Sequence, residues 1–357
     1  MSVRAMSGTC DVVLVGCGVP ARGMGWYHAK QMIDGDVPSA KLTDIVEPWF
    51  LGAGADSDAG QEFAKFKDEN EGINFLSSVD DMAQTSGKKL ALISGRTADN
   101  PSLLKEVIAK GCTHIFLEKP GAPSVGELEE MAAYAEDKGV AVYMGYNKNV
   151  TKYVTLAREF EAKTPGAVTT FIHNNAYGTD ELGECFERNS EGMLKNMAVH
   201  ELALLVTYYG VTADTIESVV ADKEYSNCLT IGDYTDFAKI GFTITTTAGK
   251  TVTVKADRCG GSNSLAIVEV DGVEKFRSMT PDAELEAWVA PRQAANPDWM
   301  PYFLLQHDDY VTLKERACAH IASGAPGAPE GLATIGIAVD TLKVAEKLTP
   351  LLTKELL

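Results

Sequence analysis

The sequence predicts an α/β protein in which a doubly wound parallel sheet is followed by an α+β domain with an open, mainly antiparallel sheet. Three observations carry this prediction. An apolar strand near the N-terminus runs into a Gly-rich turn, strands and amphipathic helices alternate from there to residue 146, and β-rich segments with Gly turns follow residue 215. We therefore expect a first domain over residues 1–147 and a second over residues 148–357.

The amino-acid composition argues against some classes of partner and indicates the compartment in which we expect the protein. The 32 basic and 50 acidic side chains give a formal net charge of -18, which repels phosphate backbones and anionic lipids, so we expect neither nucleic acid nor membrane partners. The seven cysteines are scattered and never closely paired with metal-ligand spacing, which predicts reduced thiols and no metal site. With no apolar leader and no apolar run of ~18 residues, we expect a cytoplasmic protein, or an organellar one without its leader.

The first motif is the Gly-rich turn. An apolar strand over residues 11–15 runs into Gly16 and Gly18, and a helical pattern follows over residues 24–32. A turn of this kind between strand and helix brings backbone N–H groups and a helix N-terminus to a pyrophosphate. The segment therefore predicts a dinucleotide-binding turn.

The third small residue of this motif has two interpretations. Ala21 completes Gly-x-Gly-x-x-Ala in register, whereas Gly25 completes the motif if a few residues are inserted. We favour the insertion, which makes Pro20, Ala21 and Arg22 part of a longer phosphate loop. His28 then lies in the first helix as a packing or cofactor-side residue rather than a catalyst.

The second strand, residues 41–47, ends in Glu47. An acid at this place accepts hydrogen bonds from the adenosine ribose hydroxyls and repels a 2'-phosphate. Pro48, Trp49 and Phe50 follow without a basic residue, so the sequence favours NAD over NADP, unless a base from another loop reaches the site.

The alternation continues to residue 146, with helices expected over residues 59–67, 101–110 and 125–138 and strands over residues 74–76, 89–94, 115–117 and 140–146. The loop after the fourth strand carries Arg96 and Thr97 to the ligand-binding edge of the sheet. Arg96 either contacts cofactor phosphate or substrate there or is an ordinary surface arginine.

Glu118, Lys119 and Pro120 follow the buried strand of residues 115–117, so they lie at its C-terminal edge. Open α/β sheets bind their ligands at this edge. Lysine is rarely buried without a partner, and Lys119 beside Glu118 is placed to meet a ligand. The alternative is a solvated Lys-Pro turn.

After residue 147 the pattern changes to that of an α+β domain. We expect helices over residues 153–162, 191–209, 300–323 and 332–353 and strands over residues 167–174, 216–221, 237–247, 251–257 and 265–270. In the helix of residues 191–209, Asn196 and His200 are four apart and therefore on one face. His200 is either a hydrogen-bonded core histidine or, with Asn196, Lys195 and Glu201 alongside, a candidate for proton transfer.

A set of motifs occurs in order along nearly the whole chain, namely Gly16-Cys17-Gly18, Glu47, Glu118-Lys119-Pro120, Gly145-Tyr146-Asn147-Lys148 and Gly192-x-Leu194-x-Asn196-x-x-x-His200. Together they resemble the glucose-fructose oxidoreductase, inositol dehydrogenase and MocA (Gfo/Idh/MocA) family. The resemblance implies a Rossmann domain, NAD(P)-dependent hydride transfer at a sugar or cyclitol carbon, and an open sheet that commonly serves oligomerisation, here as a homodimer or homotetramer.

Carried over by position, the resemblance places Lys119 near the nicotinamide ribose and the reacting oxygen and makes His200 the residue that takes or returns the hydroxyl proton. A cation stabilises developing alkoxide charge, and an imidazole titrates near neutral pH. Two positions depart from the family: Asn196 stands where Asp is frequent, and Lys148 where Arg is frequent. The resemblance also points to Asn147 at the cofactor and to Asn175, Tyr177 and Lys195 in the substrate pocket.

Three functions follow as hypotheses. The first is an NAD-preferring dehydrogenase or reductase of a sugar-like or polyhydroxylated small molecule. Because Asn196 cannot accept a proton, the second is reduction of a C=N bond in an imine or amino substrate. The third is a regulatory protein that binds NAD(H) without turnover, against which the presence of both Lys119 and His200 argues.

Overall fold

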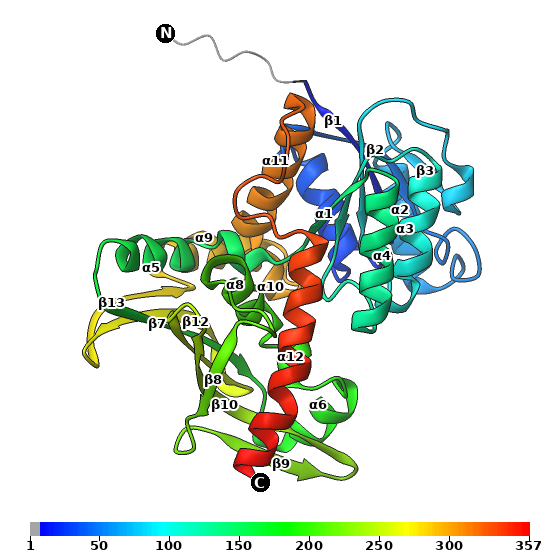
Figure 1. Cartoon of the computed structure of the whole chain (residues 1–357). Helices are drawn as coiled ribbons and strands as arrows, with labels where there is room; N and C mark the ends of the chain where they lie inside the picture. The colour runs from blue at the N-terminus through cyan, green and yellow to red at the C-terminus, as the bar shows by residue number, and fades with distance from the viewer. Residues whose placement is uncertain (1–7) are drawn as a thin grey trace. The chain divides into compact units, whose positions relative to one another are not determined.

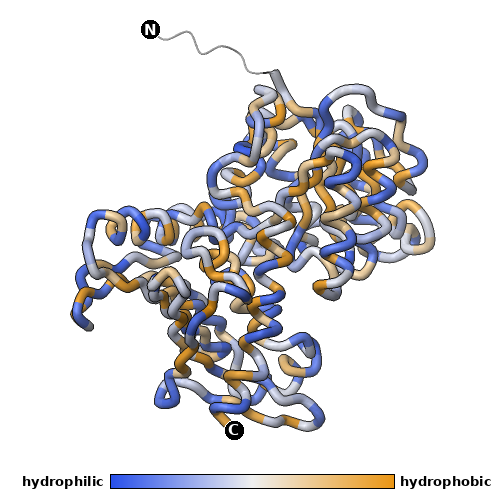
Figure 2. The backbone as a smooth tube through the Cα atoms, viewed as in Figure 1, coloured by the Kyte–Doolittle hydropathy of each residue, from blue (hydrophilic) through white to orange (hydrophobic). Residues whose placement is uncertain are grey.

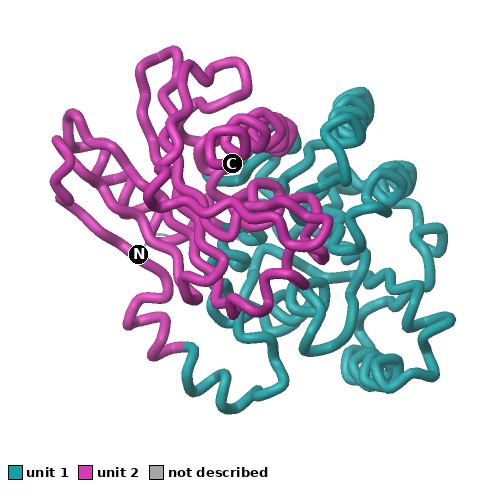
Figure 3. The backbone as a smooth tube through the Cα atoms, turned by 90° about the horizontal axis from the view of Figure 1, so that it is seen from below, with its two compact units in different colours: residues 1–147, 289–336 teal, residues 148–288, 337–357 magenta. Residues whose placement is uncertain are grey.

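The computed structural model describes residues 8–357 and divides into two compact units (Figures 1 and 3). Unit 1 contains the chain up to residue 147 together with residues 289–336, and unit 2 contains residues 148–288 and 337–357. The first boundary lies where the sequence analysis places it. The second domain expected over residues 148–357 is not continuous, however, because helix α11 (His307–Ser323) buries its apolar face against the sheet of unit 1.

Unit 1 is built on a six-stranded parallel sheet in the order β3-β2-β1-β4-β5-β6. This is the doubly wound order, and it confirms the predicted fold class. The strands are β1 (Cys10–Val15), β2 (Ala40–Val46), β3 (Asn74–Leu76), β4 (Lys89–Ile93), β5 (His114–Leu117) and β6 (Ala141–Met144). The helices are α1 (Met24–Ile33), α2 (Asp58–Asp68), α3 (Asn100–Ala109), α4 (Val125–Asp137), α10 (Pro301–Leu305) and α11.

The central strands of this sheet are continuous apolar runs because helices cover both faces. Val12, Val13 and Leu14 of β1 are wholly buried. Right-handed crossovers place α1 on one face, where α11 packs beside it, and α3 and α4 against each other on the other (Figure 1). In Figure 2 the hydrophobic stretches gather inside each unit.

Unit 2 is built on a seven-stranded, mainly antiparallel sheet in the order β13-β12-β7-β11-β10-β8, with β9 paired to β10. Its strands are β7 (Ala167–Ala176), β8 (Ile216–Ala221), β9 (Asn227–Ile231), β10 (Tyr234–Thr246), β11 (Thr251–Asp257), β12 (Cys259–Val270) and β13 (Val273–Thr280). Only β7 and β11 pair in parallel. This architecture confirms the predicted second sheet.

One face of the second sheet carries the core of unit 2. Helices α5 (Lys152–Ala162), α8 (Val199–Tyr209) and α12 (Ile335–Leu356) bury Val154, Leu202 and Leu348 against inward-facing residues such as Phe242 and Val254. Burial alternates strictly along β11, which leaves the other face of the sheet partly open.

Several elements differ from the sequence predictions. The expected helix over residues 191–209 is two helices, α7 (Met193–Asn196) and α8, because residues 197 and 198 form a turn between them. The expected helix over residues 300–323 is likewise divided into α10 and α11. Strands β9 and β13 and helices α6 (Leu182–Arg188) and α9 (Ala283–Ala295), which carry mostly exposed or half-buried residues, were not predicted.

Candidate functional site

The Gly-rich turn after β1 has the backbone geometry that close approach of a ligand requires. Gly16 and Gly18 have φ of 85° and 72°, in the left-handed region that favours glycine. A Cβ atom on Gly25 would lie 1.9 Å from the carbonyl oxygen of Gly16 and 2.8 Å from that of Cys17. Gly25 therefore allows the close packing of α1 on the turn that the third glycine of this motif provides.

The insertion favoured by the sequence is the arrangement found. Helix α1 begins at Met24, and the backbone N–H of Gly23 donates to the carbonyl of Val19, which closes a short loop before the helix. Ala21 lies in this loop with φ of 63° and does not take the packing role of a third glycine. The loop is longer than the shortest form of the motif.

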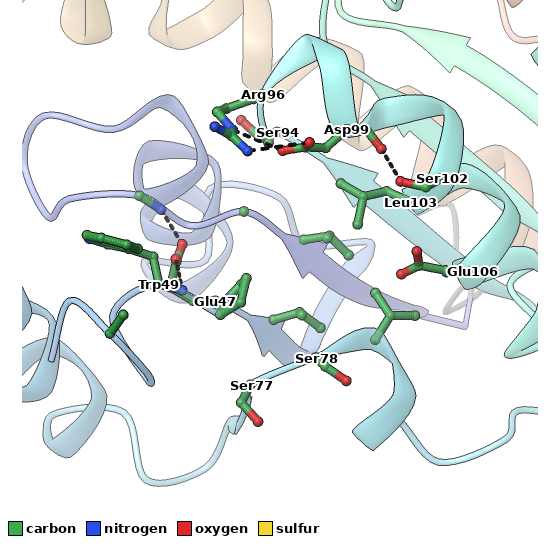
Figure 4. Close-up of a pocket in the computed structure, with 18 residues that line it drawn as sticks. Glu47, Trp49, Ser77, Ser78, Ser94, Arg96, Asp99, Ser102, Leu103 and Glu106 are labelled. Atoms are coloured by element: carbon green, nitrogen blue, oxygen red, sulfur yellow. Dashed lines mark hydrogen bonds and ion pairs between the residues drawn. The ribbon is translucent and has the colours of Figure 1, made fainter.

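Glu47 follows β2 and closes the turn from the opposite side (Figure 4). One carboxylate oxygen accepts from the N–H of Gly18 at 2.8 Å, and the other accepts from the N–H of Trp49 at 3.2 Å. The side chain is buried, with 6% of the residue exposed. A carboxylate has further lone pairs for donors from a ligand, so its position suits ribose hydroxyls.

A cleft of about 870 Å³ opens beside Glu47, at the carboxyl ends of β1, β2 and β4. Trp49, Ser77, Ser78, Ser94 and Asp99 line it with Glu47 and the glycines (Figure 4). Trp49 is 59% exposed as a whole residue, which is unusual for so large an apolar side chain. Trp49 was not predicted as a site residue, although its position two residues after Glu47 is evident in the sequence.

The two arginines predicted at the cofactor lie in surface ion pairs. The Arg22 guanidinium contacts the carboxylate of Glu62 at 2.7 Å, and Arg96, which lines the cleft, contacts Asp99 at 3.0 Å. Thr97 is half-buried at the start of the 3-10 turn after Arg96. Both arginines are long and exposed, so each is free to rotate away from an acid at little cost.

Glu118, Lys119 and Pro120 follow β5, at the sheet edge expected for them. All three are half-buried. A Cβ on Gly145 would lie 2.6 Å from a carboxylate oxygen of Glu118, so glycine is what allows the acid to reach this depth. Asn147, after β6, is buried and its amide donates to Asp309 at 3.4 Å.

Behind this edge, Glu118 contacts a buried histidine and lysine. A carboxylate oxygen of Glu118 lies 3.0 Å from Nε2 of His28, and Nδ1 of His28 lies 3.0 Å from Nζ of Lys314. Burial lowers the pKa of His28 to about 4, with the Lys314 charge adding to the effect. Burial also lowers the pKa of Lys314 to about 7. Neither contact was predicted.

Unit 2 contains a second polar cluster, around Glu201 of α8. Nζ of Lys148 lies 2.5 Å from one carboxylate oxygen of Glu201 and 3.0 Å from Oγ of Ser264, and Nδ1 of His173 lies 3.1 Å from the other oxygen. Burial raises the pKa of Glu201, but Lys148 and His173 outweigh it and hold that pKa well below its usual range. Burial and the Lys148 charge lower the pKa of His173.

Asn196 and His200 do not share one helix face, because the turn at residues 197 and 198 separates them. The amide of Asn196 donates to Glu191 at 2.8 Å, and His200 is half-buried in the first turn of α8. Lys195 forms an ion pair with Glu346 at 2.8 Å. The catalytic roles suggested for Asn196 and His200 stay predictions.

The remaining substrate-pocket candidates lie on or beside β7. Asn175 is two residues from His173 and therefore on the same face of the strand, which is the face that meets Glu201. The Tyr177 hydroxyl accepts from Arg188 at 3.1 Å. His173 and Ser264, opposite each other on β7 and β12, were not predicted, although His173 opens a run of polar residues that also contains the predicted Asn175.

Membrane-spanning helices and metal-binding clusters are both absent from residues 8–357. Within that range no helix has the length and apolar character of a membrane span. No group of three or more His, Cys, Asp or Glu side chains in the same range is arranged to hold a metal ion.

Comparison with known proteins agrees with this geometry. The sequence pattern of an oxidoreductase family with an NAD-binding Rossmann fold, GFO_IDH_MocA, matches residues 10–146. None of the curated proteins matches the chain.

Solved structures share the fold of both units at low sequence identity. Myo-inositol 2-dehydrogenase from Lactobacillus plantarum is 14% identical with a TM-score of 0.68, covering 98% of this chain and 97% of its own. Scyllo-inositol dehydrogenase from Lactobacillus casei, solved with NAD(H) and scyllo-inositol, is 13% identical with a TM-score of 0.65, covering 95% of each chain. UDP-N-acetylglucosamine 3-dehydrogenase from Acidithiobacillus ferrooxidans is 13% identical with a TM-score of 0.65, covering 98% of this chain and 99% of its own.

The family pattern covers every strand of the first sheet, the Gly-rich turn, Glu47 and the Glu118 to Pro120 edge. The predicted resemblance is therefore confirmed. Residues 10–146 match the NAD-binding Rossmann domain of the Gfo/Idh/MocA oxidoreductase family.

Proposed function

We propose that the protein is an NAD-preferring dehydrogenase or reductase that acts on a CH–OH group of a polyhydroxylated small molecule, such as a cyclitol or a sugar. The observation that carries the cofactor preference is Glu47. Its buried carboxylate ends β2 and bonds the Gly-rich turn, in the position where an acid meets ribose hydroxyls and repels a 2'-phosphate. Among residues 8–357, only Arg96 contributes a basic side chain to the lining of the cleft.

The residues fit a dinucleotide. Gly16, Gly18 and Gly25 allow the tight turn and close helix packing that bring backbone N–H groups to a pyrophosphate. The cleft beside Trp49 is large enough for an adenosine. Bound nicotinamide supplies a hydride acceptor or donor. We propose that Lys119, which follows β5 at the carboxyl edge of the sheet, binds the substrate oxygen and stabilises negative charge on it.

The substrate class rests on the likeness to inositol and sugar dehydrogenases and on the polar side chains of β7 and β12. His173, Asn175 and Ser264 offer donors and acceptors on one face of the second sheet. We propose that Lys148, Asn175 and His200 contact the substrate hydroxyls, and that His200 takes or returns the proton.

The test combines binding and turnover. Calorimetry with NAD+ and NADP+ should show tighter binding of NAD+, and Glu47→Gln should lower NAD+ affinity by roughly tenfold or more. A panel of inositols, sugars, amines and keto acid plus amine mixtures, followed at 340 nm, then identifies the substrate class. Turnover of amines alone would replace the CH–OH proposal with C=N reduction, and binding without turnover of any compound would favour a regulatory protein.

Lys119→Ala tests the catalytic assignment once a substrate is found. We expect kcat to fall by roughly 10²-fold or more while NAD+ affinity changes little. Lys67→Ala, which removes an exposed lysine of α2, is the matched control. Full turnover by Lys119→Ala would end the assignment.

We also propose that the open face of the second sheet serves self-association as a homodimer or homotetramer. That face carries threonines such as Thr243 and Thr253, whose hydroxyls bond each other at 2.8 Å. This face is partly exposed along β10 and β11, which leaves it available to a second copy of the chain. Light scattering after size-exclusion chromatography measures the mass, and a monomer at micromolar concentration would contradict the proposal.

A further inference from the structure

Unit 1 contains a buried lysine, Lys314, behind the candidate active-site edge. None of the carboxylates in residues 8–357 contacts it directly. Lys314 of α11 is 1% exposed and His28 of α1 is wholly buried, whereas the Glu118 side chain is 14% exposed toward the edge where Lys119 follows. The three groups form a chain in which His28 lies between the lysine and the acid. Neither Lys314 nor His28 has a role in the proposed hydride and proton transfer.

The hydrogen bonds of this chain fix the state of the imidazole. An ammonium group only donates, so Nδ1 of His28 accepts from Lys314 and Nε2 carries the proton that it donates to Glu118. Because burial holds the pKa of His28 at about 4, the imidazole is neutral at physiological pH. The contact of His28 with Glu118 is therefore a hydrogen bond and not an ion pair.

Lys314 is surrounded by few charges. From α1 it meets His28 and the side-chain oxygen of Gln31, and from its own helix it meets the ring of Tyr310 and the thiol of Cys318. Glu118 and Asp36 act on it only at longer range. Burial outweighs these two acids, and a pKa of about 7 means that the charge of Lys314 changes across the physiological range.

We propose that Lys314 is a proton-binding site coupled to the oxidation state of the nicotinamide, with His28 and Glu118 joining it to the sheet edge. The inference rests on the proposed function, which brings the nicotinamide ring to the edge at Glu118 and Lys119. The residues involved are positioning residues, since neither Lys314 nor His28 touches the cofactor or the substrate.

The coupling is electrostatic. An oxidised nicotinamide ring carries a positive charge and a reduced ring carries none, so a protonated Lys314 opposes binding of NAD+ and has little effect on NADH. By linkage, NAD+ binding drives the proton off Lys314, and loss of the ring charge on reduction favours its return. Oxidation of a CH–OH group yields a hydride for the ring and one proton, and Lys314 is a base that gains proton affinity at that moment.

The experiment measures cofactor affinity and needs no substrate. Titration of NAD+ and NADH at pH values from 6 to 9 should show that the ratio of Kd for NAD+ to Kd for NADH falls by about fivefold as pH rises through 7. Lys314→Met, neutral at every pH, should hold the ratio at its high-pH value. Lys314→Arg, charged at every pH, should hold it at its low-pH value, and Lys67→Met should behave as the wild type.

A second measurement uses the unmodified protein and therefore does not depend on whether the variants fold. Calorimetry at pH 7 in two buffers of different ionisation enthalpy counts the protons exchanged on binding. We expect NAD+ to release a fraction of a proton and NADH to release less. Equal proton counts for the two cofactors, or a pH-dependent ratio that persists in Lys314→Met, would overturn this inference alone, whereas failure of both cofactors to bind would overturn the proposed function.

Discussion

Each unit buries a lysine together with a carboxylate and an imidazole, but the three groups are joined in a different order. In unit 2, Lys148 contacts Glu201 directly at 2.5 Å and His173 takes the other carboxylate oxygen. In unit 1, His28 separates Lys314 from Glu118. Direct contact lets the charges of Lys148 and Glu201 compensate each other, whereas separation leaves the burial of Lys314 largely uncompensated.

The order of the three groups decides whether the charge of a cluster changes with pH. In unit 2 the pKa of Glu201 stays well below its usual range despite burial, so this carboxylate keeps its negative charge at every physiological pH. In unit 1 the pKa of Lys314 falls to about 7, so that cluster changes its charge with pH. The same three residue types thus give a structural pair in one place and a titrating group in the other.

The largest expected effect comes from breaking the direct pair. Glu201→Gln leaves the Lys148 ammonium buried without its counter-charge, and we expect the free energy of unfolding of unit 2 to fall by about 3–5 kcal/mol. Urea unfolding measures this loss. Glu346→Gln removes the partner of Lys195 in an exposed pair and should cost at most about 1 kcal/mol. A loss of that small size for Glu201→Gln would show that direct contact is not what stabilises the cluster.

A smaller effect is expected from the matching change in unit 1. Glu118→Gln keeps a hydrogen-bond acceptor for His28, and Lys314 can release its proton above pH 7 instead of remaining charged. At pH 8 we expect a loss of about 1–3 kcal/mol by urea unfolding. If Glu118→Gln destabilised as much as Glu201→Gln, the contrast between the two clusters would fail.

The fold of the α/β part of the molecule could be predicted because the sequence patterns that indicate it are local. The runs before Gly16 and Glu118 are apolar since helices cover both faces of the sheet, and the acids and glycines at their ends mark the ligand-binding edge directly. Gly25 was recognised as the packing glycine because a helical pattern begins beside it, not at Ala21.

The two buried clusters could not be predicted from the sequence because the residues that form each of them are distant in sequence. Glu201 was considered as a partner for His200, yet it meets Lys148 and His173, which are supplied by other elements. The spacing of Asn196 and His200 suggested one helix, but a turn intervenes. Lys314 did leave a signal: it stands among the buried helical positions Tyr310, Leu313, Ala317 and Cys318, where a solvated lysine does not belong.

The two clusters should also govern stability in different pH windows. Below pH 4.5 the unfolded chain binds a proton at Glu201 that the folded chain does not, so stability is lost as pH falls below that value. Between about pH 7 and 10.5 the unfolded chain keeps the Lys314 proton that the folded chain has released, so stability rises with pH there. Each slope is at most about 1.4 kcal/mol per pH unit.

Difference profiles against wild type isolate the two groups. Glu201→Gln should flatten the acid window alone, and Lys314→Met the alkaline window alone, when urea unfolding is repeated across pH. An acid-window change in Lys314→Met equal to that in Glu201→Gln would mean that the clusters are not independent.

The smallest expected effect comes from removing the Ser264 hydroxyl in the cluster of unit 2. Ser264 accepts a hydrogen bond from Lys148 at 3.0 Å and is buried, so Ser264→Ala removes one of the contacts that satisfy the ammonium but leaves the Glu201 charge in place. We expect a loss of about 1 kcal/mol, since the counter-charge and not the hydroxyl compensates the burial of Lys148. Ser218→Ala, at an exposed position of β8 in the same sheet, is the control and should change unfolding little. A loss of stability close to that of Glu201→Gln would contradict this expectation. It would show that the complete set of hydrogen bonds around Lys148, and not the carboxylate charge alone, stabilises the cluster.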